Sequence, residues 1–249
     1  MRLEPPLEPP YEVSGYVLAG GRSRRMGRDK AMLMLAGRPL IEHAVAKLRR
    51  ICSEVSILSH DDELARYAPL VPDLYPGCGP MGGIEAALVH TPRDWNLILP
   101  VDVPFLPAAF LEVWVRATLG RAAKAGVRIA MYVVDGVPQP ALLLIHRELA
   151  PYLTRSLARG EYKLTPALYA SAAEIGEKQG ASIEDVLQLT VWDAPAAVSM
   201  SERSGGEEVP GSVGASSLPQ QKRSDLWFAN LNTPEDLARA DQHANLLDM

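Results

Sequence analysis

Residues 15–30 read Gly15-Tyr16-Val17-Leu18-Ala19-Gly20-Gly21-Arg22-Ser23-Arg24-Arg25-Met26-Gly27-Arg28-Asp29-Lys30. An apolar run ends in two glycines, and a basic loop follows that closes with a third glycine and a lysine. Glycines let the backbone approach a ligand and turn at positive φ, and successive free N–H groups in such a turn form a concave anion site. The cationic side chains of this loop repel one another unless an anion lies among them. The stretch therefore predicts a strand that leads into a phosphate-binding loop.

The spacing of these residues differs from that of two common phosphate-binding motifs. In the P-loop the lysine follows a glycine and precedes Ser or Thr, whereas Lys30 lies between Asp29 and Ala31. The dinucleotide motif needs G-x-G-x-x-G, whereas here Gly20-Gly21 is followed next by Gly27. An ordinary glycine-containing β–α turn with a solvated basic loop is therefore the alternative interpretation.

The composition is that of an ordinary globular chain, with 249 residues, 47% hydrophobic and 22% charged. The net charge is −5 although the loop is strongly basic, which favours a local anion site over general nucleic-acid binding. The two cysteines, Cys52 and Cys78, lack metal-type spacing and suit a reducing cytoplasm. The sequence has no apolar run of about 18 residues or more, so no membrane span is expected.

Composition also divides the chain into regions. Residues 1–13 are proline-rich and acidic, lack the apolar core of a signal peptide, and are interpreted as a flexible extension. Residues 199–224 are rich in Ser, Gly, Pro and charge and are interpreted as a flexible insertion. Residues 14–249 are expected to form a single domain that contains this insertion.

Short apolar runs alternate with amphipathic stretches in the first half of the chain, which predicts a parallel sheet covered by helices on both faces. The run Asn96-Leu97-Ile98-Leu99 suits a central parallel strand. The second half predicts an antiparallel hairpin joined around residues 135–138. The predicted strands are 15–18, 55–58, 70–72, 95–101, 127–134, 141–145 and 189–192, and the predicted helices are 39–50, 61–67, 81–90, 106–119, 147–157, 164–173, 184–187 and 233–247.

An aspartate, Asp102, follows the most apolar strand candidate and lies between two prolines. In open α/β sheets, ligands bind beyond the carboxyl ends of the strands, where the glycine loop is also expected. A carboxylate there can hold Mg²⁺ together with substrate phosphates. The alternative is that Asp102 is only the N-cap of the next helix.

The loop at residues 73–83 contains four glycines and two prolines and follows another strand candidate. Its N–H groups are expected to line a base or ribose pocket, and a rigid turn is the alternative. Cys78 lies in this loop, but the nearby sequence offers no histidine to activate it.

Two asparagines, Asn230 and Asn232, precede the last predicted helix and point to the same side if that stretch is extended. Two amides so placed can bind a heterocycle or a phosphate. Thr233 is expected as the helix N-cap, Pro234 as the first helical residue and Asp236 as the third. Capping by the asparagines themselves is the alternative.

Together these segments resemble the molybdenum cofactor guanylyltransferases (molybdopterin-guanine dinucleotide biosynthesis protein A). The resemblance spans about residues 14–192 and 227–246. It rests on Leu18-Ala19-Gly20-Gly21-x-Ser23-x-Arg25-Met26-Gly27-x-Asp29-Lys30, then on Gly37-Arg38-Pro39-Leu40, Gly79-Pro80-Met81-Gly82-Gly83, Asp102 with Pro104, and Asn230-Leu231-Asn232-Thr233-Pro234-Glu235.

The resemblance implies a three-layer α/β/α sandwich of the nucleotide-diphospho-sugar transferase type, with a Rossmann-like, mostly parallel sheet. It implies an Mg²⁺-dependent cytoplasmic enzyme that transfers GMP from GTP to the terminal phosphate of molybdopterin cofactor. The products are a molybdopterin guanine dinucleotide and pyrophosphate. Molybdoenzymes or cofactor-delivery proteins are expected partners, whereas nucleic acid and membranes are not.

The same resemblance implies roles for individual residues. Lys30 would hold the phosphates, Asp73 the nucleoside and Asp102 the Mg²⁺. Arg25 or Lys30 would stabilise charge that develops on the α-phosphate and pyrophosphate. The expected GTP-binding set is Leu18, Ala19, Gly20, Gly21, Lys30, Asp73, Gly79 and Asp102; the expected catalytic set is Arg25, Lys30 and Asp102; and the expected cofactor-side set is Asn230 and Asn232.

The chain departs from the family pattern at two places. Relatives often carry an asparagine near the end of the second strand, where this chain has Leu58-Ser59-His60. They also often carry His-Pro before a later strand, where this chain has Gln139-Pro140.

Two classes of alternative function are considered. Sister cytidylyltransferases usually have Leu-Ala-Ala-Gly where this chain has Leu18-Ala19-Gly20-Gly21, and tend to lack a loop like Gly79-Pro80-Met81-Gly82, so GTP is favoured over CTP. Another small-molecule nucleotidyltransferase on the same scaffold is a related alternative. A non-catalytic nucleotide-binding regulatory module is the alternative outside enzymes, and it would not need both Lys30 and Asp102.

Overall fold

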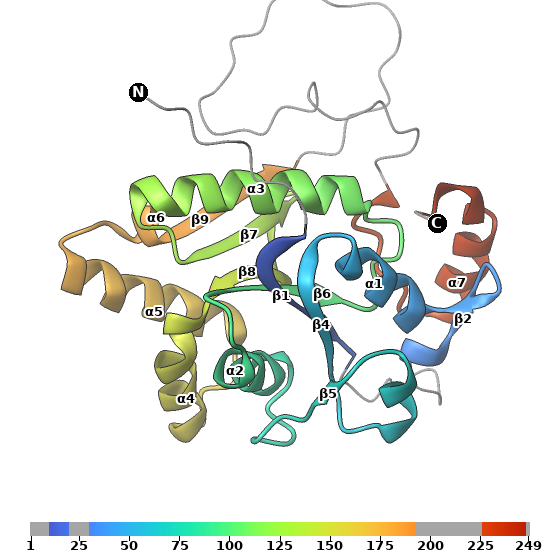
Figure 1. The fold of residues 1–249 in the computed structure, drawn as a ribbon, viewed down its shortest axis with the longest axis horizontal. Coiled ribbons are helices and arrows are strands. Elements are labelled where there is room, and N and C mark those ends of the chain that lie inside the picture. Colours follow the sequence, from blue (N-terminus) through green and yellow to red (C-terminus); the bar gives the residue numbers. More distant parts are fainter. Residues whose placement is uncertain (1–9, 20–29, 193–225, 248–249) are drawn as a thin grey trace, which may run out of the picture.

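A seven-stranded sheet organises the computed structural model, which describes residues 10–19, 30–192 and 226–247 (Figure 1). The basic loop at 20–29 and the expected insertion at 199–224 lie outside the described residues. In spatial order the strands are β5 (Leu70–Val71), β4 (Cys52–Leu58), β1 (Tyr11–Leu18), β6 (Trp95–Pro100), β8 (Val137–His146), β7 (Ile129–Val134) and β9 (Leu187–Trp192).

Most neighbouring strands of this sheet run parallel, as predicted. β1 pairs in parallel with β4 and β6, β4 with β5, and β7 with β9. β8 is antiparallel to both β6 and β7, which confirms the predicted hairpin. Asp135 and Gly136 form its turn with φ of 49° and 77°, the positive values that two-residue hairpin turns favour. Because the turn is this tight, β8 begins at Val137, four residues before the predicted start at 141.

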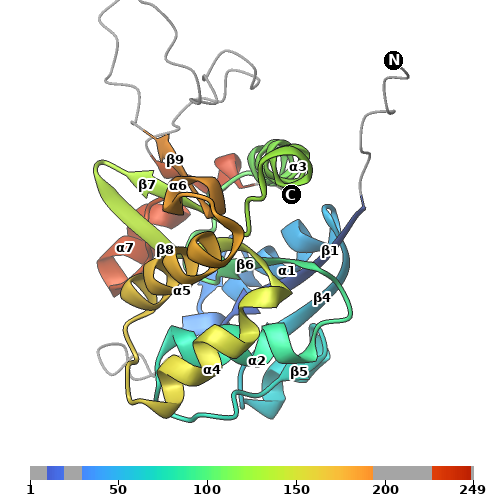
Figure 2. The same cartoon turned by 90° about the vertical axis from the view of Figure 1, so that its left-hand side faces the viewer.

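Helices cover both faces of the sheet and complete the expected α/β/α sandwich (Figure 2). One face carries α1 (Leu40–Arg49) and α3 (Ala108–Ala125). The other carries α2 (Pro80–His90), α4 (Ala150–Ala158) and α5 (Leu164–Gln179). The single-turn helix α6 (Ile183–Val186) precedes β9, as predicted. None of the described helices is long and apolar enough to cross a bilayer.

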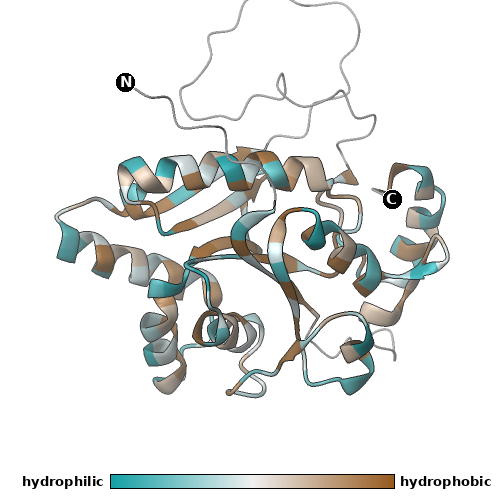
Figure 3. Ribbon diagram, in the orientation of Figure 1, coloured by the Kyte–Doolittle hydropathy of each residue, from teal (hydrophilic) through white to brown (hydrophobic). Residues whose placement is uncertain are grey.

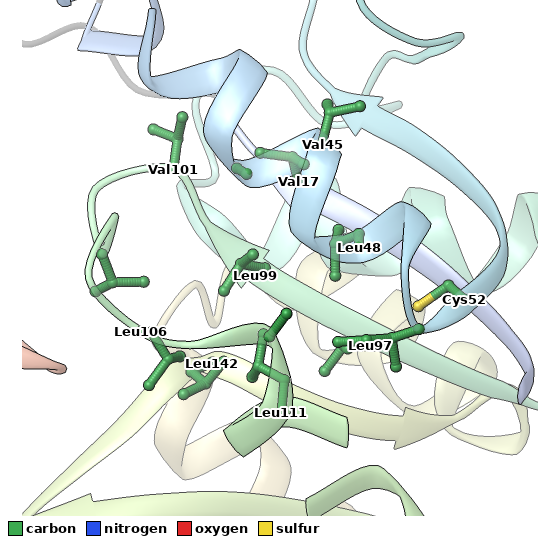
Figure 4. Close-up of a cluster of buried hydrophobic side chains, with 14 of the residues drawn as sticks. Val17, Val45, Leu48, Cys52, Leu97, Leu99, Val101, Leu106, Leu111 and Leu142 are labelled. Carbon is green, nitrogen blue, oxygen red and sulfur yellow. The ribbon is translucent and has the colours of Figure 1, made fainter. Parts of the chain in front are cut away.

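Side chains of β1 point alternately to the two faces of the sheet, so this strand contributes to the hydrophobic core on each face. Val13 and Val17 pack with α1 and α3, whereas Tyr16 packs with α2 on the opposite face. Figure 3 shows apolar residues along the inner strands, and Figure 4 shows Val17 among the buried leucines of β6 and α1. A methyl group on Gly15 would lie 3.0 Å from Sγ of Cys52, so a glycine is needed where β4 and α1 approach β1. Each buried aliphatic side chain contributes about 1.5–3 kcal/mol.

The first strand begins earlier than predicted. β1 starts at Tyr11, and both Tyr11 and Val13 are buried in the α1–α3 core. Residues 11–13, which were expected to belong to the extension, are therefore part of the sheet. The proline-rich sequence before Tyr11 obscured the alternating pattern of this strand.

Several helix boundaries also differ from the predictions. The segment at 61–67 forms the 3-10 helix Asp62–Arg66, whose start is capped by the Asp61 carboxylate. α3 and α5 run on to Gly126 and Gly180, which end them in the left-handed conformation. The predicted helix at 233–247 divides into α7 (Pro234–Asp241) and the 3-10 turn Ala244–Leu246. The segment at 147–157 begins as the 3-10 turn Arg147–Leu149 before α4.

A small hairpin of β2 (Met34–Leu35) and β3 (Arg38–Pro39) was not predicted, because two-residue strands carry no recognisable period. As a result, Pro39 is the N-cap of α1 rather than its first helical residue. His43 on α1 is buried and its Nε2–H donates to the Leu35 carbonyl, 2.9 Å away. Burial lowers the pKa of this imidazole, so the neutral ring anchors the hairpin to α1.

Candidate active site

Three parallel strands end side by side at one edge of the sheet. Leu18, the last residue of β1, pairs with Leu58 in β4 and with Pro100 in β6. The residues that follow these strands therefore meet at this edge, as ligand sites in open α/β sheets do. Segments far apart in sequence, after β1, β4 and β6, are brought together here.

Lys30, Asp102 and Asn232 form a cluster at this edge. The Lys30 Nζ donates to Oδ2 of Asp102 at 2.6 Å and to Oδ1 of Asn232 at 2.8 Å. The side chains of Lys30 and Asp102 are 16% and 20% exposed, so a ligand can still reach them. Three residues that the sequence assigned separately to phosphates, metal and cofactor thus share direct contacts.

The loop that carries Asp102 is fixed from three directions. The Val101 N–H donates to the Leu18 carbonyl at 3.3 Å, and the Leu231 N–H donates to the Asp102 carbonyl at 3.0 Å. From α1, the buried Lys47 donates its Nζ to the Pro104 carbonyl. The N-cap of α3 is Pro107, so the alternative that Asp102 merely caps the next helix is wrong.

The C-terminal segment is held so that Asn232 faces Lys30. Thr233 is the N-cap of α7, as predicted, and it also forms a reciprocal capping box with Asp236. The Asn232 backbone N–H also donates to Asp236, while its side chain contacts Lys30. Capping is therefore not the role of the Asn232 side chain. Asn230 is exposed two residues earlier, and its expected place on the cofactor side stays a prediction.

Buried aromatic rings anchor this segment to the sheet. The Trp227 ring stacks on Trp192, at the end of β9, with centroids 5.0 Å apart and planes inclined by 22°. It also contacts the Phe110 ring of α3, with centroids 5.0 Å apart. Leu231, three residues before α7, is buried in the same core. The aromatic contacts explain why a segment late in the chain can take a defined position beside Asp102.

A second cluster lies beyond β4 and β5, around Asp73. The imidazole of His60 donates from Nε2 to Oδ1 of Asp73. The other carboxylate oxygen lies against Gly82 in the first turn of α2, where an added methyl group would be 3.0 Å from it. The sequence predicted Asp73 as a nucleoside contact but did not identify His60. The position of His60 shortly after the second predicted strand, at the sheet edge where ligands bind, is the signal that could have identified this residue.

Replacing Gly82 with alanine is expected to lower the free energy of unfolding. The new methyl group would lie 3.0 Å from Asp73 and 3.0 Å from the Tyr75 carbonyl, a backbone atom that cannot move aside. Such overpacking costs roughly 1–3 kcal/mol, offset only in part by about 0.5–1 kcal/mol of helix propensity. Gly120 is an exposed helical glycine with no atom within 4 Å of its would-be methyl, so Gly120→Ala is the matched control and should stabilise. Equal shifts of both variants in urea unfolding would contradict the prediction.

The remaining predicted residues are described only in part. Ala19 and Lys30 flank the loop and are described, whereas Gly20, Gly21 and Arg25 lie outside the described residues. Gly79 is the N-cap of α2 with φ of 67°, at the same sheet edge as Asp73. The contacts predicted for these residues with a nucleotide stay predictions.

The donor chemistry around Asp102 is compatible with Mg²⁺. Within the described ranges no group of three or more His, Cys, Asp or Glu could hold a metal. However, a carboxylate oxygen and an amide oxygen, from Asp102 and Asn232, converge on one cation, the Lys30 ammonium. Mg²⁺ prefers oxygen ligands and is often held by one or two carboxylates plus substrate phosphates. A single carboxylate is thus sufficient if a polyphosphate supplies the other ligands.

Comparison with known proteins finds relatives of one family. A family model described as MobA-like NTP transferase domain matches residues 15–174, which include the basic loop, Asp73 and Asp102. A molybdenum cofactor guanylyltransferase of Serratia proteamaculans is 38% identical over 170 residues, which cover 65% of this chain and 82% of the relative.

Solved structures share the fold. The crystal structure of molybdopterin-guanine dinucleotide biosynthesis protein A from Archaeoglobus fulgidus is 25% identical with a TM-score of 0.61, covering 94% of this chain and 99% of that one. A 2-C-methyl-D-erythritol 4-phosphate cytidylyltransferase from Thermus thermophilus is 14% identical with a TM-score of 0.51, covering 92% and 98%, and shows the fold alone. The expected nucleotide-diphospho-sugar transferase type of α/β fold is confirmed.

Proposed function

Because the chain belongs to the MobA-like NTP transferase family, and within it to the molybdenum cofactor guanylyltransferases, we infer that it transfers GMP from GTP to molybdopterin cofactor. The observation that carries this inference is the meeting of Lys30, Asp102 and Asn232 at the carboxyl edge of the sheet. These residues come from three separate family motifs and converge on one point. The curated relatives argue against the cytidylyl alternative, since several are named for guanylyl transfer at 32–38% identity.

The reaction exchanges one phosphoanhydride bond for another. A terminal phosphate oxygen of the cofactor attacks the α-phosphorus of GTP, and the bond from that phosphorus to the β-phosphate oxygen breaks. Pyrophosphate leaves with the bonding electron pair, so no covalent nucleophile from the protein is required. Positioning and neutralisation of charge are the main contributions that a protein makes to such transfers.

The described residues suit these two tasks. The Lys30 ammonium lies at the sheet edge within reach of incoming phosphates and would neutralise charge on the α-phosphate and pyrophosphate. Asp102 would hold Mg²⁺, which supplies further neutralisation of the triphosphate when bound. Asn232, with Asn230, would face the cofactor side, and Asp73 would contact the nucleoside. Gly20, Gly21, Arg25 and Gly79 would complete the proposed site, together with Leu18 and Ala19.

The cellular setting is proposed on the same basis. GTP and molybdopterin are the substrates that family membership implies. Activity in the cytoplasm, and delivery of the product to molybdoenzymes directly or through cofactor-delivery proteins, agree with a biosynthetic transferase. These points extend the proposal beyond the reaction itself.

Calorimetric titration with GTP, CTP and ATP, each with and without Mg²⁺, tests the proposed function. GTP is expected to bind at least tenfold more tightly than CTP or ATP, and Mg²⁺ is expected to strengthen that binding. A preference for CTP would assign the chain to cytidylyl transfer, and absence of binding to all three would contradict a nucleotidyltransferase. A positive result justifies assaying the guanine dinucleotide product with the cofactor itself.

A further inference from the structure

The carboxylate of Asp73 is held from two sides beyond β4 and β5. On one side His60 donates Nε2–H to Oδ1, and on the other Oδ2 rests against the first turn of α2 at Gly82. The Asp73 side chain is 17% exposed, whereas that of His60 is 56% exposed. The carboxylate is therefore largely enclosed but still partly accessible, and the imidazole beside it is mostly exposed.

The surroundings of this carboxylate suit a planar base. The residue after Gly82 is Gly83, and a methyl group there would lie 3.5 Å from both Leu18 and Leu58. These two leucines are the last residues of β1 and β4, so they lie beside the start of α2. Leu58 is buried, whereas Leu18 is partly exposed, so Leu18 offers apolar packing for a ring whose edge would meet the fixed carboxylate.

Guanine matches the acceptors that remain. Its N1–H and 2-amino group are neighbouring donors, and two carboxylate oxygens can accept both at once. An ionised carboxylate has about four acceptor positions, so the bond from His60 leaves room for both base contacts. Neither adenine nor cytosine presents two such donors side by side.

We propose that His60 is a positioning residue for guanine selection: it fixes the Asp73 carboxylate in the orientation that accepts the N1–H and 2-amino group. The proposal rests on the proposed function and adds a role for a residue at the place where relatives often carry asparagine. Without the Nε2–H donor, the carboxylate can rotate about its side-chain torsions, and discrimination between guanine and related bases falls.

The test compares GTP with ITP, whose base keeps N1–H but lacks the 2-amino group. Both nucleotides are titrated calorimetrically with Mg²⁺ into the full chain, as wild type and as His60→Ala, His60→Gln and His90→Ala. His90 is exposed at the far end of α2, so His90→Ala is the matched control. Glutamine places an N–H donor where the imidazole has Nε2–H and should restore the contact.

The wild type is expected to prefer GTP over ITP by about tenfold or more, the scale of a hydrogen bond to a charged group. In His60→Ala this ratio should fall at least threefold, whereas His60→Gln and His90→Ala should keep it. A His60→Ala variant that loses affinity for both nucleotides equally would assign the residue a structural role and overturn the inference. Equal wild-type affinities for GTP and ITP would overturn it as well. A wild type that binds neither would instead contradict the proposed function.

Discussion

Replacing Lys30 with alanine is expected to lower turnover by about two to three orders of magnitude, the scale of one lost transition-state contact. Negative charge grows on the α-phosphate and on the departing pyrophosphate, and the Lys30 ammonium is the described cation at the sheet edge beside Asp102. The side chain is mostly buried and pairs with Asp102, so the melting temperature of the variant is measured as well, to separate loss of catalysis from loss of stability. Formation of the guanine dinucleotide, followed by chromatography under saturating GTP, measures the effect.

A matched control separates the local role of Lys30 from loss of one positive charge. Lys124 is exposed in the last turn of α3, on a helix that contributes no side chain to the cluster around Asp102. Lys124→Ala should therefore keep wild-type turnover. If Lys30→Ala, with an unchanged melting temperature, turned over within threefold of wild type, its assigned role would be wrong.

Asp102→Asn is expected to reduce turnover at least a hundredfold and to remove the strengthening of GTP binding by Mg²⁺. Asparagine keeps the size of the side chain and one acceptor for Lys30, but it lacks the negative charge that favours a divalent cation. The backbone contacts of residue 102 with Leu231 and of Pro104 with Lys47 do not involve the carboxylate, so the loop should keep its place. Titration of GTP with and without Mg²⁺, together with product formation, measures both effects.

Asp94→Asn provides the comparison for this second variant. Asp94 precedes β6 at the opposite end of the strand from Asp102, is 68% exposed and pairs with Arg147. Its replacement should leave both turnover and the Mg²⁺ effect unchanged. Undiminished Mg²⁺ dependence in Asp102→Asn would show that this carboxylate does not hold the metal.

The sequence predicted the architecture because its strands and helices carry strong local patterns. The apolar run of β6 and the Asp135-Gly136 turn each indicate their element without knowledge of the rest of the chain. Prediction failed where the decisive contacts are distant. The predicted start of β1 is too late, because Tyr11 is recognisable as part of a strand only once it is buried against α1 and α3.

Local sequence patterns also decide which parts of the site are predictable. Asp102 and Lys30 lie in recognisable motifs. The contact of Lys30 with Asn232 spans 202 residues of sequence, and no local pattern predicts it. His60 follows the second predicted strand, but its contact with Asp73 is evident only once β4 and β5 lie side by side. Lys47 has the spacing of a core helical position, which usually carries an apolar residue, and its bond to the Pro104 carbonyl could not be foreseen.

The stacked rings of Trp192 and Trp227 bear on how the length of this chain can change. Their contact brings the two ends of the segment between residues 192 and 227 together, whatever that segment contains. The entropy lost on closing a flexible loop grows only with the logarithm of its length, by about 0.6 kcal/mol for each doubling. Changing the number of residues between these two tryptophans should therefore alter the free energy of unfolding little, while the amide that reaches Lys30 stays in register.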